Sequence, residues 1–465
     1  MASQYLDLIH QTFDWPVYDF DLDADRLTFH GLDLYEVAKQ YGTPLRINYV
    51  PKIGQQIQKA RNIFTKAINK NGYKGSYTFC YCTKSSHFPF VLKEIFENGS
   101  HIETSSAYDM KLLEWLAEDG RLKPQHYIIC NGFKPENYIK KVAEFINRGF
   151  HNTMPVLDNL DELGNYFSHT DQPFNIGLRI AAEEEPKFEF YTSRLGIRAK
   201  DIVPYYNEQI RDNPKVKLRM LHFFINTGIT DTAYYWSELD KCISTYCDLK
   251  KVCPDLEILD IGGGFPVPNS LYMDYDYQYM ADEIIKNIKE KCEEENVEPP
   301  HIFTEFGSFT VAESGATIFS VLNEKQQNDA EKWYMIDGSL ITHLPDTWGT
   351  GQRFILLPLN KWTNPYQRIN IGGLTCDSMD YYNSEVHQNQ VFLPQNLGEK
   401  EDLLIGFFYT GAYQDTLGGI GGLQHCLVPS PRHLLIDKNE NDELTYELFR
   451  EEQGPESMLK RMRYY

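Results

Sequence analysis

Long hydrophobic segments are absent from this sequence of 465 residues. No apolar run reaches the roughly 18 residues of a membrane-spanning helix, and the first residues, MASQYLDLIHQTF, lack the basic and then apolar parts of a secretory signal. Positive charge is also scarce, because 45 Lys and Arg face 66 Asp and Glu, for a formal net charge of −21. We therefore expect no membrane partner, no signal peptide and no nucleic-acid partner, since nucleic-acid binding requires a basic surface.

Cysteine motifs are missing as well. The nine cysteines include no CxxC pair and no spacing typical of a zinc site. We expect reduced thiols, a cytoplasmic location and no bound metal. The acidic composition is compatible with a cationic substrate, because an acidic surface raises the local concentration of cations. It also fits a charge that serves only solubility, which is the commoner case.

The length and the aromatic content of 14% predict two well-packed domains. Between residues 45 and 315, apolar runs such as GSYTFCYC, QHYIIC and LEILDI alternate with helix-like segments that often end in glycine. About eight such runs predict a closed (β/α)8 (TIM) barrel, in which the chemistry gathers at the C-terminal ends of the strands. Residues 316–465 read as an antiparallel β-domain that residues 1–44 join, so the expected fold class is α/β plus all-β.

A glycine motif at residues 262–264 favours an anion as ligand, and a glutamate motif around residue 305 could bind a ring nitrogen. In LDIGGGFPV, Gly262, Gly263 and Gly264 directly follow an apolar run, and glycine lets backbone NH groups approach a bulky anion such as phosphate. In IFTEFGS, Glu305 ends the next run and could pair with a protonated ring nitrogen. The alternatives are a tight turn without a ligand and a glutamate that caps a helix or forms an ion pair.

Other candidates carry reactive groups. Lys84 ends the run GSYTFCYCTK, and a lysine amine at a barrel mouth can attack an aldehyde, although most such lysines simply extend into solvent. In LTCDSMDYY, Cys376 could deliver a proton while Asp377 and Asp380 hold a cation; a buried thiol and turn aspartates are the alternative. Tyr413 in TGAYQD is by itself typical of a core or turn residue.

The order of these motifs resembles that of the fold-type III pyridoxal-phosphate decarboxylases, the alanine-racemase-like group that acts on ornithine, arginine and diaminopimelate. The resemblance spans nearly the whole chain. It implies that Lys84 carries pyridoxal 5′-phosphate, that Glu305 keeps the pyridine nitrogen protonated, and that Cys376 returns a proton to the substrate. It further implies a homodimer in which Cys376 and Asp377 enter the active site of the other subunit. The remaining cofactor-binding roles that it implies fall on Glu103, Arg179, the segment Arg194 to Gly196, His222 stacked on the ring, Gly262 to Gly264, Gly307, Ser308 and Tyr413.

Two departures from the family pattern concern the phosphate and the substrate. The family usually follows its histidine with Gly-Ser, whereas this chain reads HFFINTG, where Asn226 or Thr227 could replace the serine. The family usually reads Glu-Pro-Gly-Arg, whereas this chain reads EFGS, with Ser308 in place of the arginine. Because that arginine helps to hold the distal carboxylate of diaminopimelate in some members, its absence speaks against diaminopimelate.

The substrate is expected to be a cationic amino acid. CDSMD, GAYQD and the lead-in NGYKGSYTFCYCTK resemble the biosynthetic arginine decarboxylases, which are usually longer than this chain. Carboxylates at Asp377, Asp346 and Asp380 would suit a guanidinium, which pairs with carboxylates through two parallel hydrogen bonds. We expect decarboxylation of L-arginine to agmatine in polyamine biosynthesis.

Several alternatives to arginine remain open. Ornithine, lysine, diaminopimelate or a carboxynorspermidine-type substrate would suit the same chemistry. A catalytically silent homologue with a regulatory binding role is a further alternative. An amino-acid racemase is less favoured, because such enzymes place an arginine near the pyridine nitrogen.

Overall fold

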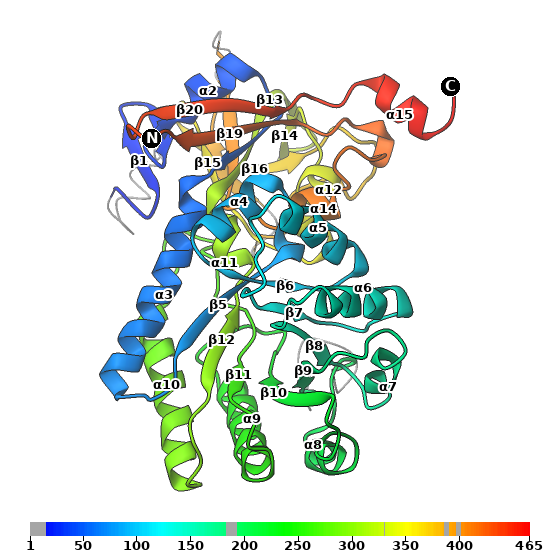
Figure 1. Ribbon diagram of the computed structural model, residues 1–465. Helices are drawn as coiled ribbons and strands as arrows, with labels where there is room; N and C mark the ends of the chain where they lie inside the picture. Colours follow the sequence, from blue (N-terminus) through cyan, green and yellow to red (C-terminus); the bar gives the residue numbers. More distant parts are fainter. Residues whose placement is uncertain (1–14, 183–192, 330, 386–389, 397–400) are drawn as a thin grey trace. The chain divides into compact units, whose positions relative to one another are not determined.

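The structure is a computed structural model that describes residues 15–182, 193–329, 331–385, 390–396 and 401–465 (Figure 1). These residues form two compact units. The β unit runs up to Lys52 and includes Val267–Asp274 and Val311–Tyr465, and the barrel unit comprises Ile53–Pro266 and Tyr275–Thr310. No helix in the described ranges is long and apolar enough to span a membrane.

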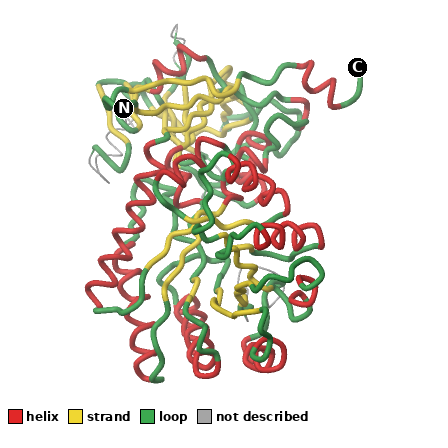
Figure 2. Tube along the Cα trace, in the orientation of Figure 1, coloured by secondary structure: helices red, strands yellow, loops and turns green. Residues whose placement is uncertain are grey.

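Eight parallel strands close into a barrel in the barrel unit, in the order β10, β11, β12, β5, β6, β7, β8, β9. Strand β12 pairs with β5 in parallel and closes the ring, which places Glu305 opposite Cys80. In Figure 2 the strands of this barrel are yellow and the helices of the β/α units red. The predicted (β/α)8 barrel is thus confirmed. The strands are β5 (Tyr77–Cys82), β6 (His101–Thr104), β7 (Ile128–Cys130), β8 (Thr153–Leu157), β9 (Phe174–Arg179), β10 (Val216–His222), β11 (Ile258–Asp260) and β12 (His301–Glu305).

Three of the barrel helices, α5, α9 and α10, begin where the sequence offers a short polar side chain. Ser106, Thr232 and Asp276 accept hydrogen bonds from the backbone NH groups of Asp109, Tyr235 and Tyr279 and thereby cap α5, α9 and α10. Each such cap contributes about 1 kcal/mol to helix stability. The helices of this part of the chain are α3 (Pro51–Asn71), α4 (Pro89–Glu97), α5 (Ala107–Glu118), α6 (Glu136–Asn147), α7 (Glu162–Tyr166), α8 (Ala199–Tyr205), α9 (Ala233–Val252), α10 (Tyr277–Glu294) and α11 (Ser308–Val311), with the short helices η1 (Thr83–Ser85) and η2 (Tyr206–Ile210).

An apolar layer fills the interior of the barrel. It consists of buried side chains from six strands: Cys80, Ile129, Met154, Val156, Met220, Ile258 and Phe303. Burial of one large apolar side chain of this kind contributes about 1.5–3 kcal/mol. Because side chains two residues apart on a strand point to the same face, the residues two positions after Met220, Ile258 and Phe303 form the next layer toward the C-terminal ends. That layer is polar, and it is described below.

The β unit is built on a nine-stranded sheet with the order β17-β16-β14-β13-β4-β19-β20, in which β18 also pairs with β13 and β15 pairs with β18. Only the pairs β14–β16 and β4–β19 of this sheet are parallel, so the predicted antiparallel character holds for most of it. Strand β4 pairs with β13 and β19 in this sheet. The domain limits of 45–315 placed these residues in the barrel, and the strand pairing corrects that part of the prediction.

A small second sheet and several short helices complete the β unit. Strands β1 to β3 form a small separate sheet before β4. The strands of the unit are β1 (Phe20–Asp23), β2 (Arg26–Phe29), β3 (Leu32–Asp33), β4 (Leu45–Tyr49), β13 (Gly315–Gln326), β14 (Lys332–Ile336), β15 (Ile355–Pro358), β16 (Tyr366–Gly372), β17 (Val391–Pro394), β18 (Leu404–Phe408), β19 (Arg432–Lys438) and β20 (Leu444–Arg450). Its helices are α2 (Leu34–Tyr41), α12 (Leu340–His343), α13 (Pro345–Gly349), α14 (Gln414–Leu417) and α15 (Pro455–Arg461), with η3 (Ala312–Ser314) and η4 (His425–Leu427).

Candidate active site

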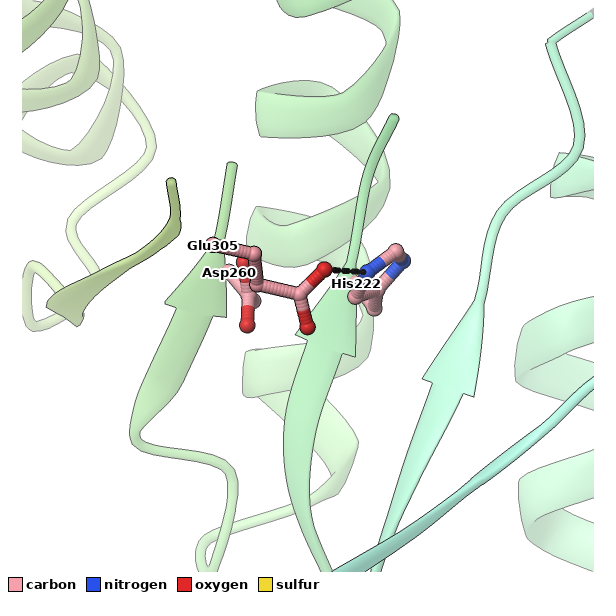
Figure 3. Close-up of side chains that lie close together, drawn as sticks. All are labelled: His222, Asp260 and Glu305. Carbon is pink, nitrogen blue, oxygen red and sulfur yellow. Dashed lines mark hydrogen bonds and ion pairs between the residues drawn. The ribbon is translucent and has the colours of Figure 1, made fainter. Parts of the chain in front are cut away.

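His222, Asp260 and Glu305 form the polar layer at the C-terminal ends of β10, β11 and β12 (Figure 3). One polar atom from each side chain lies within 4.8 Å of the other two. Nε2 of His222 donates to Oε2 of Glu305 at 3.1 Å, and Nδ2 of Asn131 donates to Oε1 at 2.8 Å. Glu305 is therefore held through both of its oxygens, and its position is defined.

The pKa values of Asp260 and Glu305 are shifted in opposite directions. All three side chains are nearly inaccessible, with relative exposures of 1% for His222, 0% for Asp260 and 5% for Glu305. Burial, followed by the neighbouring Glu305 charge, raises the pKa of Asp260 well above its usual range. Burial also acts to raise the pKa of Glu305, but His222, Lys84 and the Asn131 amide outweigh it and lower that pKa. The layer thus carries a protonated Asp260 beside an ionised Glu305.

His222 is neutral at physiological pH, because burial lowers its pKa below the ordinary value more strongly than Glu305 raises it. A neutral imidazole that donates from Nε2 leaves its other nitrogen, Nδ1, as an acceptor. Burial of an ionised carboxylate between a neutral imidazole and an amide lowers the stability of the fold unless a cationic group binds to the carboxylate. The arrangement can therefore hold a cation or the protonated nitrogen of an organic ring.

Lys84 lies in η1, directly after β5, and half of its side chain is exposed. Its Nζ lies 3.6 Å from Oε2 of Glu103, which is completely buried at the end of β6. Burial raises the pKa of Glu103, and the Lys84 charge acts in the opposite direction. Strand β5 therefore delivers an amine to the mouth of the barrel, next to the polar layer.

The glycine loop after β11 lies against the loop after β10. A Cβ atom on Gly263 would lie 2.3 Å from the carbonyl oxygen of Glu305, and one on Gly264 would lie 2.7 Å from Cα of Gly228. The backbone NH of Ile229 donates to the carbonyl of Gly264 at 2.9 Å, which joins the two loops. No larger residue fits at these positions without moving the backbone.

Polar side chains next to this loop junction have no hydrogen-bond partner among the described residues. They are both polar side-chain atoms of Asn226 and the hydroxyl of Thr227, all of them buried. The oxygens of a multiply charged anion would accept from Nδ2 of Asn226 and from the hydroxyl of Thr227. Asn226 and Thr227 therefore present buried polar donors of the kind that phosphate oxygens bind.

Arg179 ends β9, and its guanidinium lies 5.6 Å from the ring centre of Phe224. Phe224 follows His222 by two residues, so Arg179 is close to the polar layer. Gly196 donates its NH to Oδ1 of Asp158 at 2.9 Å, and Ile197 donates to the carbonyl of Arg179 at 2.8 Å. The predicted segment Arg194 to Gly196 thus returns to the end of β9, while residues 183–192 lie outside the described residues.

Gly307 and Ser308 lie at the start of α11. A Cβ atom on Gly307 would lie 2.0 Å from Oγ of Ser85, the residue after Lys84. Gly307 is therefore required for the close approach of the lysine turn to the end of β12. Ser308 is the first residue of α11.

Cys376 and Asp377 lie on the surface of the β unit. The side chain of Asp377 is 37% exposed and forms an ion pair with His425 at 3.4 Å. Cys376 is exposed and free, and its Sγ lies 3.7 Å from Sγ of Cys426. Tyr413 precedes α14 with φ of +65°, a conformation that costs a non-glycine residue about 1–3 kcal/mol and often marks functional sites.

The other two acidic candidates are engaged inside the β unit. Asp346 accepts from Nε2 of Gln414 at 2.6 Å. Asp380 is buried, with Oδ1 accepting from the NH of Leu340 at 2.7 Å and Oδ2 accepting from the NH and hydroxyl of Thr375 at 3.0 and 2.7 Å. Asp380 therefore orders the segment that carries Cys376, and its oxygens are occupied by that task.

A model of the pyridoxal-dependent decarboxylase family, pyridoxal binding domain, matches residues 54–312, more than half of the chain. The chain belongs to this family. Among curated relatives, the biosynthetic arginine decarboxylase of Prochlorococcus marinus strain MIT 9215 is 23% identical over an alignment of 561 positions, which covers 93% of this chain and 85% of the relative.

Solved structures of the family share the fold. The biosynthetic arginine decarboxylase of Campylobacter jejuni superposes with a TM-score of 0.81 at 22% identity, covering 96% of this chain and 89% of its own. The diaminopimelate decarboxylase of M. jannaschii gives a TM-score of 0.79 at 18% identity, with 95% of this chain and 97% of its own covered. The protein is thus a pyridoxal-phosphate-dependent amino-acid decarboxylase, as its sequence predicted.

The residues present fit the cofactor of the family. The barrel end offers an amine (Lys84), an ionised carboxylate (Glu305) and unpartnered buried polar atoms on Asn226 and Thr227. These are the groups that an aldehyde, a protonated ring nitrogen and a phosphate require. Pyridoxal phosphate therefore finds a complementary group for each of its three functional parts.

Two residues at this end of the barrel, Asp260 of the layer and Asn131 beside it, were not among the sequence candidates. Asp260 directly precedes the glycine loop and accepts from the NH of Gly262 at 2.8 Å, and Asn131 directly follows β7. Both satisfy the criterion that selected Glu305, a polar residue at the end of an apolar strand. That signal was available in LDIGGG and YIICNG, but only the folded barrel brings the three strand ends together.

Proposed function

We propose that the protein decarboxylates a basic amino acid, L-arginine before the others, to give agmatine and CO2 in polyamine biosynthesis. The observation that carries the proposal is the ionised Glu305, held by Asn131 and His222 at the end of a barrel whose mouth carries Lys84. The choice of arginine is supported by curated relatives that are named biosynthetic arginine decarboxylases and match 93% of the chain.

Each residue of the barrel end has a task in this reaction. When bound, pyridoxal phosphate supplies an electron-accepting ring for the electron pair that the departing CO2 leaves. The amine of Lys84 would hold the aldehyde carbon of the cofactor, and the carboxylate of Glu305 would keep the proton on the ring nitrogen. His222 would pack on the ring, with its orientation fixed by the hydrogen bond to Glu305. The glycine loop, Asn226 and Thr227 would bind the phosphate.

Asp260 is proposed as a residue that positions Glu305. Its protonated carboxyl lies beside Glu305 and its Oδ1 accepts from the NH of Gly262. With Oδ1 occupied, the proton would reside on Oδ2 and face the Glu305 carboxylate. Asp260 would thereby favour the ionised form of Glu305 and connect it with the phosphate loop.

Asp377 is proposed as the partner of the substrate guanidinium. Of the three aspartates predicted to bind substrate, Asp377 is the exposed one, since Asp346 and Asp380 are engaged with Gln414, Leu340 and Thr375. A bidentate carboxylate–guanidinium pair is stronger and more directional than an ammonium contact. Arginine would therefore be preferred over ornithine and lysine, while Ser308 in place of the family arginine disfavours diaminopimelate.

We also propose a cytoplasmic homodimer with shared active sites. Cys376 and its neighbours lie in a part of the β unit rich in exposed apolar side chains, with Leu374 50%, Met379 44% and Leu427 48% exposed. Exposed apolar clusters of this kind are typical of interfaces. Nine free cysteines, seven of them buried, agree with a reducing compartment.

A substrate panel tests the function. The purified protein with pyridoxal phosphate is incubated with arginine, ornithine, lysine and diaminopimelate, and CO2 and amine products are measured. Arginine should give the highest kcat/KM. Lys84→Ala should abolish turnover, whereas Lys66→Ala, at an exposed lysine of α3, should change nothing. A protein that binds the cofactor but releases no CO2 from any of the four would support the silent, regulatory alternative.

Subunit mixing tests the shared site. Lys84→Ala and Cys376→Ala proteins should each be inactive, and their mixture should regain up to about a quarter of the activity through hybrid dimers with one intact site. Absence of recovery, with exchange of subunits verified, would contradict sharing.

A further inference from the structure

Two exposed cysteines lie side by side in the β unit. Sγ of Cys376 and Sγ of Cys426 are 3.7 Å apart, although 50 residues separate them in the sequence. Both thiols are free and exposed, whereas the other seven cysteines are buried. In the single chain, the two exposed cysteines are therefore also neighbours.

The two segments that carry these thiols are held together by a second contact. Asp377, next to Cys376, forms an ion pair with His425, next to Cys426, at 3.4 Å. Each segment is also fixed on its own side. Thr375 is bound to the buried Asp380, and the backbone NH of Gly421 donates to the buried Ser430 at 3.0 Å. The proximity of the thiols is thus supported by the surrounding structure.

The backbone at Cys426 is strained. Cys426 and Leu427 both have φ of +53°, in the left-handed region that non-glycine residues rarely adopt. Such a conformation costs about 1–3 kcal/mol per residue and persists where the surroundings enforce it. Cys426 is therefore both in a rarely adopted backbone conformation and in contact with Cys376.

We propose that Cys376 and Cys426 form a reversible disulfide when a low-molecular-weight disulfide, such as oxidised glutathione, oxidises them. One thiolate attacks a sulfur of the glutathione disulfide, which forms a mixed disulfide and releases one glutathione thiolate. The second thiolate then attacks the protein sulfur, which forms the Cys376–Cys426 bond and releases the second glutathione. Two protein thiols are oxidised, one glutathione disulfide is reduced to two thiols, and the two thiol protons pass to the released glutathione.

The geometry needs little change for this reaction. A disulfide requires sulfurs about 2.05 Å apart, so the two Sγ atoms must approach by less than 2 Å, a movement that side-chain rotation can supply. Interaction with Cys426 raises the pKa of Cys376, so the reduced Cys376 retains its proton near neutral pH. The reduced pair therefore keeps the acidic hydrogen that a proton donor needs, and the disulfide has none.

The consequence for activity rests on the proposed function, in which Cys376 returns a proton to the substrate. Oxidation would remove that proton and fix the thiol side chain to the η4 segment. The enzyme would then be inactive in an oxidising cytoplasm and active again after reduction. Disulfides in the cytoplasm are typically transient and regulatory, which fits an exposed and strained pair.

A second pair of cysteines provides an internal comparison. Cys247 on α9 and Cys292 on α10 also interact, but both are at most 1% exposed. A dissolved disulfide reaches exposed thiols and not buried ones. The proposal therefore predicts selective oxidation of one pair out of two.

The experiment treats the loaded enzyme with mixtures of oxidised and reduced glutathione. Free thiols are counted after unfolding, and the disulfide is located by peptide mass spectrometry. The wild type should fall from nine thiols to seven, with a cross-linked peptide pair that contains Cys376 and Cys426 and lacks two hydrogens. Activity should fall at least tenfold and return with dithiothreitol.

Variants separate the possible outcomes. Cys426→Ser should form no internal disulfide and should carry glutathione on Cys376 instead, while Cys247→Ser should behave as the wild type apart from one thiol fewer. Nine thiols retained under oxidising mixtures, or a disulfide between subunits, would overturn the pairing. An internal Cys376–Cys426 disulfide without loss of activity would overturn the switch. Because the peptide map does not depend on turnover, failure of the proposed decarboxylation leaves the disulfide result interpretable.

Discussion

Glu305→Gln is the substitution that most directly tests the polar layer. In the wild type, Oε1 of Glu305 accepts from Asn131 at 2.8 Å and Oε2 accepts from His222 at 3.1 Å. Glutamine has one oxygen and one NH2 group, so it cannot accept from both Asn131 and His222 while His222 keeps its proton on Nε2. One hydrogen bond to a charged acceptor is lost, and the remaining one becomes a neutral bond.

The magnitude follows from these two bonds. A hydrogen bond to a charged group contributes about 1.5–3 kcal/mol and a neutral one about 0.5–1.5 kcal/mol, and a buried unpaired donor costs about 1–3 kcal/mol. The apoprotein should therefore lose about 2–4 kcal/mol of unfolding free energy. The contact to the protonated ring nitrogen is lost as well. At 1.4 kcal/mol per tenfold change, the Kd for pyridoxal phosphate should rise about 10–100-fold.

The assays are chemical denaturation of the apoprotein, fluorescence titration with pyridoxal phosphate, and turnover at saturating cofactor. Turnover should remain at least 100-fold lower even at saturation, because an unprotonated ring accepts electrons poorly. Glu283→Gln on α10 makes the same chemical change at a partly exposed glutamate that pairs with Lys286, and it should alter none of the three measurements. A Glu305→Gln protein with wild-type stability, cofactor affinity and turnover would refute the assignment of an ionised Glu305.

Three further predictions concern the neighbouring groups. Asp260→Asn should become more stable relative to the wild type as pH rises. Because the pKa of Asp260 is raised in the folded state, its stabilising contribution is present below the ordinary aspartate pKa and is lost as pH increases toward the folded pKa. In that window the difference in unfolding free energy should grow by about 1.4 kcal/mol per pH unit, measured by denaturation between pH 5 and 8. Thr227→Val removes the hydroxyl that has no partner among the described residues but keeps the shape of the side chain. In titrations, the Kd for pyridoxal phosphate and the Kd for inorganic phosphate should each rise about 10-fold or more. If neither Kd changes, Thr227 is not part of the phosphate site. Asp377→Asn should raise the KM for arginine about 10–100-fold and leave the Kd for the cofactor within about twofold, and an equal effect on both would contradict a substrate-specific role.

Much of the barrel was predictable because its signals are local. Runs such as YTFCYC and EILDI are short, apolar and followed by glycine or a cap residue, so strand ends can be located within a few residues. Lys84, His222 and Glu305 each lie at or just after such an end, where a (β/α)8 barrel places its chemistry. Strand β4 was assigned to the barrel because nothing in its own sequence indicates its distant partners. LRINY is also a short run typical of a strand, and its partners β13 and β19 are more than 260 residues away.

Which side chains lie next to each other was harder to predict from the sequence than which residues carry the chemistry. That Asp260 faces Glu305 depends on β11 and β12 being neighbours with both residues in the same layer, which is a property of the closed barrel. That Cys426 lies beside Cys376 depends on how a 50-residue segment returns to its start. Burial also reversed one expectation. Asp380 looked like a substrate carboxylate in CDSMD, but its oxygens are saturated by Leu340 and Thr375.

The polar layer connects the cofactor with the stability of the barrel. Barrel interiors are normally filled by branched apolar side chains, and replacing buried charged groups by such residues is often neutral or stabilising. This barrel instead buries Glu103, Asp260 and Glu305 at its C-terminal end, with Asp260 and Glu103 held at raised pKa and Asn226 and Thr227 lacking partners. Glu103, Asp260, Asn226 and Thr227 disfavour the empty barrel, and a ligand that supplies a cationic nitrogen and phosphate oxygens would reduce that penalty. Because such a ligand binds only the folded state, stability should rise by RT ln(1 + [L]/Kd) with cofactor concentration. On the proposed assignment, the residues that make the empty barrel less stable are the ones that bind pyridoxal phosphate.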